Sequence, residues 1–230
     1  MAPRSRVVRD AIAIGAAVAV FGLSFGVFAV TAGLSPLAAC ALSLLMCTGA
    51  SQFAAVGVLA AGGTFGAAAS SAFLLGLRNI AYGVSLVPYI GRRSFLTRLL
   101  AAHLVLDETT AMATAHIDRE EGRRAFWATG VSIYVAWNVG TLVGAAAGNA
   151  LGDPATLGLD AALTGGFLAL IAPQLRTRRG ALAAVCGSAI AIILVPLAPA
   201  GVPIIAAAAG AVPALLVPKR AGEQSASETG

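Results

Sequence analysis

The sequence predicts an all-α integral membrane protein, a polytopic bundle of about 7–8 transmembrane helices. Hydrophobic residues make up 58% of the 230 positions and charged residues only 11%, whereas a soluble domain carries about 25% charged residues. The apolar runs are close to the roughly 20 residues that a helix needs to cross the hydrocarbon core. They lack the alternation of apolar and polar residues that a transmembrane β-barrel requires, so helices are favoured.

Eight apolar segments are the candidate helices, and residues typical of turns separate most of them. The segments cover 11–33, 36–60, 65–90, 96–115, 125–150, 155–175, 180–197 and 201–218. The turn-like stretches are GLSP at 33–36, AGG at 61–63, GDP at 152–154 and LAPAGVP at 197–203.

The first segment, Ala11–Gly33, follows Arg4, Arg6 and Arg9, an arrangement that also occurs in secretory signal peptides. The apolar core of a signal peptide is about 7–15 residues long. This run has 23 residues, so we interpret it as the first transmembrane helix.

The second, third and fourth segments are predicted to be broken near the middle of the membrane. The second contains TGASQ at 48–52, the third GLRNIAYG at 76–83, and the fourth the acidic pair Asp107 and Glu108. Irregular backbone is tolerated at membrane depth where it lines a cavity or packs inside protein. Secondary transporters build central sites from such discontinuous helices, often within inverted repeats, and an inverted repeat is therefore one expectation for this chain.

The net charge of +5 comes from basic residues in short groups between apolar runs. This pattern is typical of cytoplasmic loops, and we do not expect nucleic acid as a partner. The groups expected in the cytoplasm are Arg4/Arg6/Arg9, Arg119/Arg123/Arg124, Arg176/Arg178/Arg179 and Lys219/Arg220. Both termini are therefore predicted to be cytoplasmic.

One basic group conflicts with this topology. Arg92, Arg93 and Arg98 follow the third segment, so a count of single crossings places them outside. Either the rule is broken here or neighbouring segments are hairpins that return to the same side, and the sequence leaves both alternatives open.

Three ionisable residues lie deep inside apolar segments, namely Arg78, Asp107 and Glu108. A charge at the bilayer centre costs about 2.5–3.5 kcal/mol on insertion scales, so it persists where it pairs, faces water or acts on a substrate. Helical spacing predicts two polar stripes. Their members are His103, Asp107, Thr110 and Thr114 on one segment, and Arg78, Tyr82, Ser85 and Tyr89 on the other. We expect the stripes to face each other, with Arg78 neutralising one carboxylate.

Three interpretations of these charges remain open. A structural ion pair would lock two helices, but it would explain only one of the two acids. A substrate or proton site would explain both, because adjacent carboxylates cannot both ionise cheaply in a low dielectric and one that holds a proton suits proton coupling. The third alternative is a cytoplasmic acidic surface, if segment 96–115 does not span the membrane.

Other motifs are weaker. Glycines spaced four apart, at Gly22–Gly26 and Gly140–Gly144–Gly148, predict close-packed helix faces. Cys40, Cys47 and Cys186 lie in apolar runs without metal-binding spacing, so we interpret them as small core residues. The chain has no Walker, HExxH or GxSxG motif, which argues against an ATPase, a protease or a hydrolase. We predict no enzyme activity, no cofactor and no metal site.

Several motifs together resemble the AzlC family, the large subunit of branched-chain amino acid exporters. They are GASQF at 49–53, LRNIAYGVSLVPY at 77–89, DET at 107–109 and GLDAALTGGFLALIAP at 158–173. The resemblance covers nearly the whole chain. It implies a bacterial inner-membrane exporter of valine, leucine and isoleucine, with methionine as a further candidate. It also implies a separately encoded, small hydrophobic partner, the AzlD-type subunit.

An amino acid zwitterion needs donors for its carboxylate and an acid for its ammonium group. The predicted substrate-binding residues are Ser51, Gln52, Arg78, Asn79, Tyr82, Asp107 and Asn138, and the predicted proton-coupling residues are Glu108 and Asp107. The predicted domains are a basic cytoplasmic N-terminus at 1–10, a transmembrane transport domain at 11–218 and a disordered cytoplasmic tail at 219–230. The competing hypotheses are a membrane scaffold with a structural ion pair, and a channel.

Overall fold

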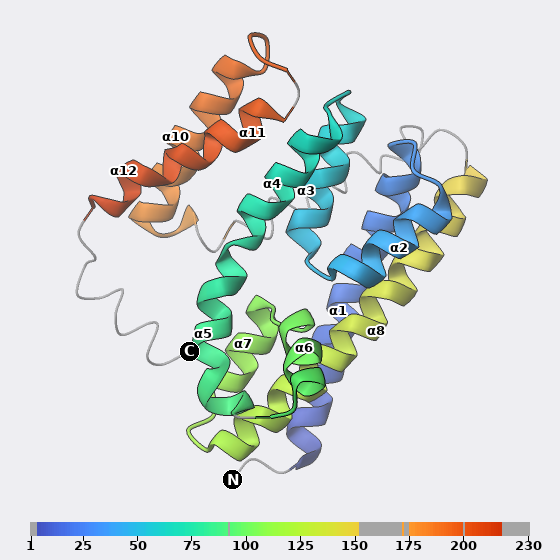
Figure 1. Ribbon diagram of the computed structural model, residues 1–230, viewed down its shortest axis with the longest axis vertical. Helices are drawn as coiled ribbons and strands as arrows, with labels where there is room; N and C mark the ends of the chain where they lie inside the picture. The colour runs from blue at the N-terminus through green and yellow to red at the C-terminus, as the bar shows by residue number, and fades with distance from the viewer. Residues whose placement is uncertain (1–3, 92, 152–171, 173–174, 200, 218–230) are drawn as a thin grey trace. The chain divides into compact units, whose positions relative to one another are not determined.

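The computed structural model of the chain describes residues 4–91, 93–151, 172, 175–199 and 201–217, apart from the side chains of 149–151 and 215. Every regular element within these residues is a helix, as the sequence predicts (Figure 1). The helices are α1 (Arg4–Thr31), α2 (Pro36–Met46), α3 (Gly49–Ala60), α4 (Phe65–Gly76), α5 (Arg78–Ile90), α6 (Phe95–His103), α7 (Asp107–Thr114), α8 (Arg119–Leu151), α10 (Arg178–Leu194), α11 (Val202–Ala207), the 3-10 helix η2 (Ala208–Gly210) and α12 (Ala211–Leu215).

These helices coincide with seven of the eight predicted segments. The remaining segment, 155–175, lies outside the described residues except for 172 and 175, and so does the predicted tail at 219–230. The fifth segment starts earlier than predicted, because Arg119 already begins α8. Glu120 forms ion pairs with Arg123 and Arg124 one turn further along, and such pairs stabilise a helical first turn.

Among the described helices, three stretches are long and apolar enough to cross a membrane. They are Ser5–Thr31, Phe65–Ile90 and Arg119–Gly148. Large apolar side chains such as Leu37 and Phe95, each 80% exposed, cover outer faces, and extended exposed apolar surface is typical of protein that contacts lipid or a partner. The chain is therefore a helical membrane protein, while the total of about 7–8 crossings stays a prediction.

The predicted interruptions of segments two and four are present as breaks, whereas that of segment three is reduced to one turn residue between two helices. Between α2 and α3, Cys47 adopts a left-handed conformation with φ 37° and ψ 33°, which is uncommon for a residue other than glycine. Between α6 and α7, Leu106 is extended at φ −132° and ψ 165°. The interruption between α4 and α5 is slighter, because Leu77 keeps right-handed helical angles, so Phe65–Ile90 runs almost as one helix.

The glycine motifs form the contact between α1 and α8, which lie side by side (Figure 1). A Cβ atom on Gly22 would lie 2.5 Å from the Trp137 carbonyl oxygen, and one on Gly144 would overlap the Leu23 backbone. The two helices therefore approach backbone to backbone, which only glycine allows at these positions. This confirms the predicted packing face and shows that the two glycine rows face each other.

The chain forms two compact units. The first consists of residues 1–56 and 72–159, and the second of 57–71 and 160–230. In the second unit, α10 packs against α11, η2 and α12, and Arg179 Nε donates to the Val217 carbonyl at 2.7 Å. All the predicted site residues lie in the first unit.

Candidate functional site

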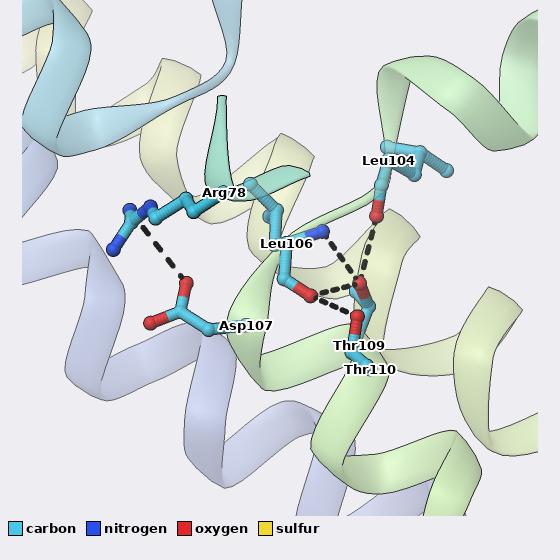
Figure 2. A network of polar contacts seen from close by, with 6 residues as sticks. All are labelled: Arg78, Leu104, Leu106, Asp107, Thr109 and Thr110. Carbon is cyan, nitrogen blue, oxygen red and sulfur yellow. Dashed lines mark hydrogen bonds and ion pairs between the residues drawn. The ribbon is translucent and has the colours of Figure 1, made fainter. Parts of the chain in front are cut away.

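The acidic pair lies at the start of a short helix rather than within a long one. Helix α6 ends at His103, the chain continues through Leu104–Leu106, and α7 begins at Asp107 (Figure 2). Asp107 and Glu108 therefore occupy the first turn of α7. Carboxylates are stabilised there by the unpaired N–H groups and the positive end of the helix dipole, which offsets part of their cost at membrane depth.

Threonine hydroxyls hold the backbone of this break. Thr109 Oγ1 accepts from the Leu106 N–H at 2.9 Å and donates to the Leu104 carbonyl at 2.8 Å. Thr110 Oγ1 donates to the Leu106 carbonyl at 2.6 Å. Both side chains are buried, where an unpaired backbone group would be costly. Figure 2 shows that most of these contacts meet at the extended residue Leu106, directly before α7.

The predicted polar stripe through His103, Asp107, Thr110 and Thr114 is consequently wrong. The stripe required an unbroken helix, whereas the chain is extended at Leu106. His103 Nε2 lies 3.0 Å from the Leu44 carbonyl, and Thr114 donates to the Thr110 carbonyl.

Two hydroxyl groups of the second predicted stripe, on α5, also donate to backbone carbonyls. Ser85 donates to the Tyr82 carbonyl at 2.8 Å and the Tyr89 hydroxyl donates to the His116 carbonyl at 3.3 Å. These hydroxyls of the two stripes thus bind backbone carbonyls, whereas Arg78 and Asp107 remain half-exposed.

The predicted pairing of Arg78 with one carboxylate is present. Arg78 Nη2 lies 3.9 Å from Asp107 Oδ1, and the two side chains are 43% and 50% exposed (Figure 2). Arg78 is the first residue of α5 and Asp107 the first of α7. The pair therefore links two helix starts, loosely and with room for a further polar group at each partner.

Glu108 is half-buried and links α7 to a different element. Its carboxyl lies within electrostatic range of the Cys47 thiol, and also of Asp107 and Arg78. Cys47 is the left-handed residue between α2 and α3. The two neighbouring acids thus have different partners, Arg78 for Asp107 and the α2–α3 break for Glu108.

Ser51 and Gln52 lie in the first turn of α3 and are buried. A Cβ atom on Gly76 would lie 3.7 Å from Ser51 Oγ, so Ser51 is adjacent to the end of α4. Gln52 Nε2 donates to the Leu42 carbonyl at 3.1 Å, bridging α3 back to α2. Its Oε1 atom is buried without a hydrogen-bond partner among the described residues.

The helix ends at these interruptions lie near one another in pairs. Ser51, at the start of α3, lies near Gly76 at the end of α4, and Arg78 at the start of α5 pairs with Asp107 at the start of α7. The Glu108 carboxyl lies within electrostatic range of the Cys47 thiol between α2 and α3. We call these residues together the break junction. It combines a cation, two acids and the free N–H groups at the starts of α3 and α7, which together can bind a ligand that carries both charges.

The other predicted residues lie apart from these contacts. Asn138 Oδ1 accepts from Ser43 Oγ at 2.8 Å and its amide donates to the Tyr134 carbonyl, so it links α8 to α2. Tyr82 packs against an apolar cluster that includes Leu86. Asn79 is half-buried beside Arg78.

Sequence reasoning missed the roles of Cys47 and Thr109. A cysteine next to a Thr-Gly pair gives no sign of a left-handed backbone. Thr109 did carry a signal, because a hydroxyl two residues after the first acid is well placed to reach back to the helix start.

The sequence model of one protein family, described as AzlC protein, matches residues 13–151. The chain is also similar to the inner membrane protein YgaZ of Escherichia coli (strain K12), with 36% identity over 151 residues. This match covers 63% of the chain and 60% of the relative, so it spans less than two thirds of that protein's length. No solved structure matches the chain. The matched range 13–151 contains the whole break junction.

Proposed function

The chain belongs to the AzlC family, and from this premise we propose that it is a secondary transporter that exports branched-chain amino acids. The observation that carries the proposal is the break junction, where Arg78, Asp107 and Glu108 meet. Discontinuous helices that surround charged residues are the common form of a transporter site. Membrane transport is also consistent with the similarity to an inner membrane protein.

The charges at the break junction suit an amino acid zwitterion. Arg78 and the N–H groups at the start of α3 would bind the carboxylate, because both are donors without an internal helix partner. Asp107 would bind the ammonium group. The 3.9 Å separation of Arg78 and Asp107 is long for an ion pair, so a substrate can insert its own charges between them.

The proposed substrate class is that of the exporters which the motifs of this chain resemble. A site for such substrates needs an apolar wall that accepts a branched side chain. One methylene is worth only about 1–3 kcal/mol in such a pocket. We therefore propose valine, leucine and isoleucine as substrates with modest discrimination, and methionine as a further one.

Glu108 is the proposed carrier of the coupling proton. It lies beside a second carboxyl group in a half-buried setting, where the two acids cannot both ionise cheaply. Asp107 faces Arg78 instead and keeps the proposed role of binding the ammonium group. Export would then release a proton from Glu108 to one side of the membrane and take up another on the opposite side.

A small hydrophobic subunit of the AzlD type is the proposed partner, in the bacterial inner membrane with both termini in the cytoplasm. The half-exposed charges of Arg78 and Asp107 cannot face lipid at membrane depth. Water, substrate or a partner subunit must cover them in the assembled transporter.

Two competing functions are less well supported. A structural lock should be close and buried, whereas exposed ion pairs contribute only about 0–1 kcal/mol and this pair is half-exposed. A channel needs a long polar lining, but the threonine and serine hydroxyls near the site bind backbone carbonyls instead.

The test is efflux of labelled valine from loaded vesicles that contain the chain and its AzlD-type partner, with and without an imposed pH gradient. Export should saturate with valine and accelerate when the gradient drives protons inward against it. Vesicles with no efflux in any condition would support the scaffold. Efflux that never saturates and ignores the gradient would support the channel.

A further inference from the structure

A second feature of the first unit lies apart from the break junction. A hollow of about 680 Å³ opens between α5 and α6. Its walls are mainly apolar, with Val87 and Ile90 on α5 and Val105 just after α6, while Arg93 and Arg98 supply the charged part of its lining. Small-molecule sites in proteins have roughly 300–1,000 Å³, so the hollow has the size of a ligand site.

Arg93 and Arg98 form no ion pair with any acid in the part of the chain that the structure describes. The ion pairs of arginine there involve Asp10, Asp107 and Glu120. Both side chains are exposed. No acid lines the hollow, so it lacks a group for an ammonium ion and does not fit a zwitterionic amino acid. Its chemistry fits an anion with an apolar tail.

The position of the hollow indicates where such a ligand would come from. The spanning stretch Phe65–Ile90 ends beside it, and 26 residues at about 1.5 Å each exceed the roughly 30 Å hydrocarbon core. Ile90 and Arg93 therefore lie near a membrane surface. Exposed apolar residues of the same helices, Val84 at 69% and Phe95 at 80%, would contact lipid tails.

We propose that this hollow binds an anionic phospholipid, with its phosphate on Arg93 and Arg98 and one acyl chain against Val87, Ile90 and Val105. Basic pockets between membrane helices recognise anionic head groups in this way. The proposal also gives the arginines that conflicted with the predicted topology a reason to exist that does not depend on which side of the membrane they occupy.

The experiment measures lipid binding to the purified full chain in detergent by native mass spectrometry. Phosphatidylglycerol and phosphatidylcholine with identical acyl chains are the probes. Each arginine near a lipid surface is worth about 1 kcal/mol, so the double variant Arg93→Gln and Arg98→Gln should bind phosphatidylglycerol roughly 30-fold more weakly. The matched control, Arg6→Gln with Arg176→Gln, removes the same charge from exposed sites elsewhere and should bind normally.

A third variant tests the apolar half. Gly83 lines the hollow, and a Cβ atom there would meet no atom within 4 Å, so Gly83→Leu should fill the space without disturbing α5. It should weaken phosphatidylglycerol binding and leave thermal unfolding unchanged. Equal binding of both lipids, or equal losses in the control variant, would overturn the proposal. Tight binding of inorganic phosphate that Gly83→Leu does not alter would also overturn it, because the site would then hold a free anion.

Discussion

The α1–α8 contact and the break junction lie in the same unit and solve opposite problems. Along the α1–α8 contact, glycines bring two long helices backbone to backbone, and Gly26 and Gly144 leave no room for a side chain. At the break junction the helices are short and interrupted, and the charged side chains stay 43% and 50% exposed. The first contact is made largely by glycines and backbone atoms, whereas the second gathers charged side chains that stay partly open.

This difference shows that the residues that hold a membrane protein together can be separate from the residues that bind a ligand. Between lipid-embedded helices there is no hydrophobic driving force, so close van der Waals packing of small residues holds the frame. Charged groups and free helix starts are costly in the same environment. Their collection at one place, supported by a packed frame, is what a transport site needs and what a purely structural bundle would avoid.

The largest loss of stability should come from a substitution in the α1–α8 contact. Gly144→Leu places a side chain against the Leu23 backbone, which cannot yield as a flexible side chain would. Overpacking a tight site costs about 1–3 kcal/mol or more, so we expect loss of folded protein, seen as aggregation in size-exclusion chromatography and a lowered melting temperature. Gly83→Leu is the control, since α5 has space there. Normal folding of Gly144→Leu would mean that α1 and α8 do not pack through these glycines.

A substitution at the break junction should lower valine affinity while changing stability only slightly. Arg78→Ala removes the proposed carboxylate donor, and a hydrogen bond to a charged group is worth about 1.5–3 kcal/mol, so valine affinity should fall roughly 10-fold to 100-fold. Stability should change by about 1 kcal/mol or less, because the pair with Asp107 is half-exposed.

Efflux and melting temperature are to be measured on the same preparation of Arg78→Ala. Normal export by this variant would remove Arg78 from the substrate site. Normal export of valine together with a collapse of the melting temperature would favour the structural lock instead.

The positions of the helices and of most of their breaks could be predicted from the sequence. Runs of apolar residues give the helices, and glycine or polar insertions mark the breaks, because both signals are local in the chain. The Arg78–Asp107 pair was also predictable, since two opposite charges inside apolar segments have few other partners. The spacing of four between glycines predicted a close-packed face on each helix for the same local reason, but not that the faces of α1 and α8 meet.

The rest depended on contacts that no local pattern encodes. The polar stripe of His103 and Asp107 assumed a continuous helix, and the extended Leu106 removed it. The hydrogen bond between Asn138 and Ser43, which lie 95 residues apart in the chain, was not predicted either. A side chain's partner across such a distance follows from packing rather than from spacing.

Variants of the two acids test whether Asp107 and Glu108 have different roles within the break junction. Asp107→Asn removes the charge that faces Arg78, so valine binding should weaken roughly tenfold at every pH. Glu108→Gln removes the proposed proton carrier and should abolish export driven by a pH gradient while valine binding and exchange continue. Binding calorimetry and gradient-driven efflux are measured for both variants. Identical defects would defeat the division of roles, and full activity of both would defeat the transport site.

The smallest effect on valine binding should come from Thr109, whose hydroxyl holds the backbone before α7 although the residue directly follows the two acids. Thr109→Val keeps the volume but removes the acceptor for the Leu106 N–H and the donor to the Leu104 carbonyl. Leaving a buried backbone group unpaired costs about 1–3 kcal/mol, so the melting temperature should fall while valine affinity per folded protein stays within about twofold.

Thr114→Val is the matched control, since this exposed hydroxyl donates to the Thr110 and Ala111 carbonyls of its own helix, and its loss should cost about 0.5 kcal/mol or less. A Thr109→Val variant with normal stability and no valine binding would reverse the assignment. The Thr109 hydroxyl would then belong to the ligand site, and the backbone of the break would be held by Thr110 alone.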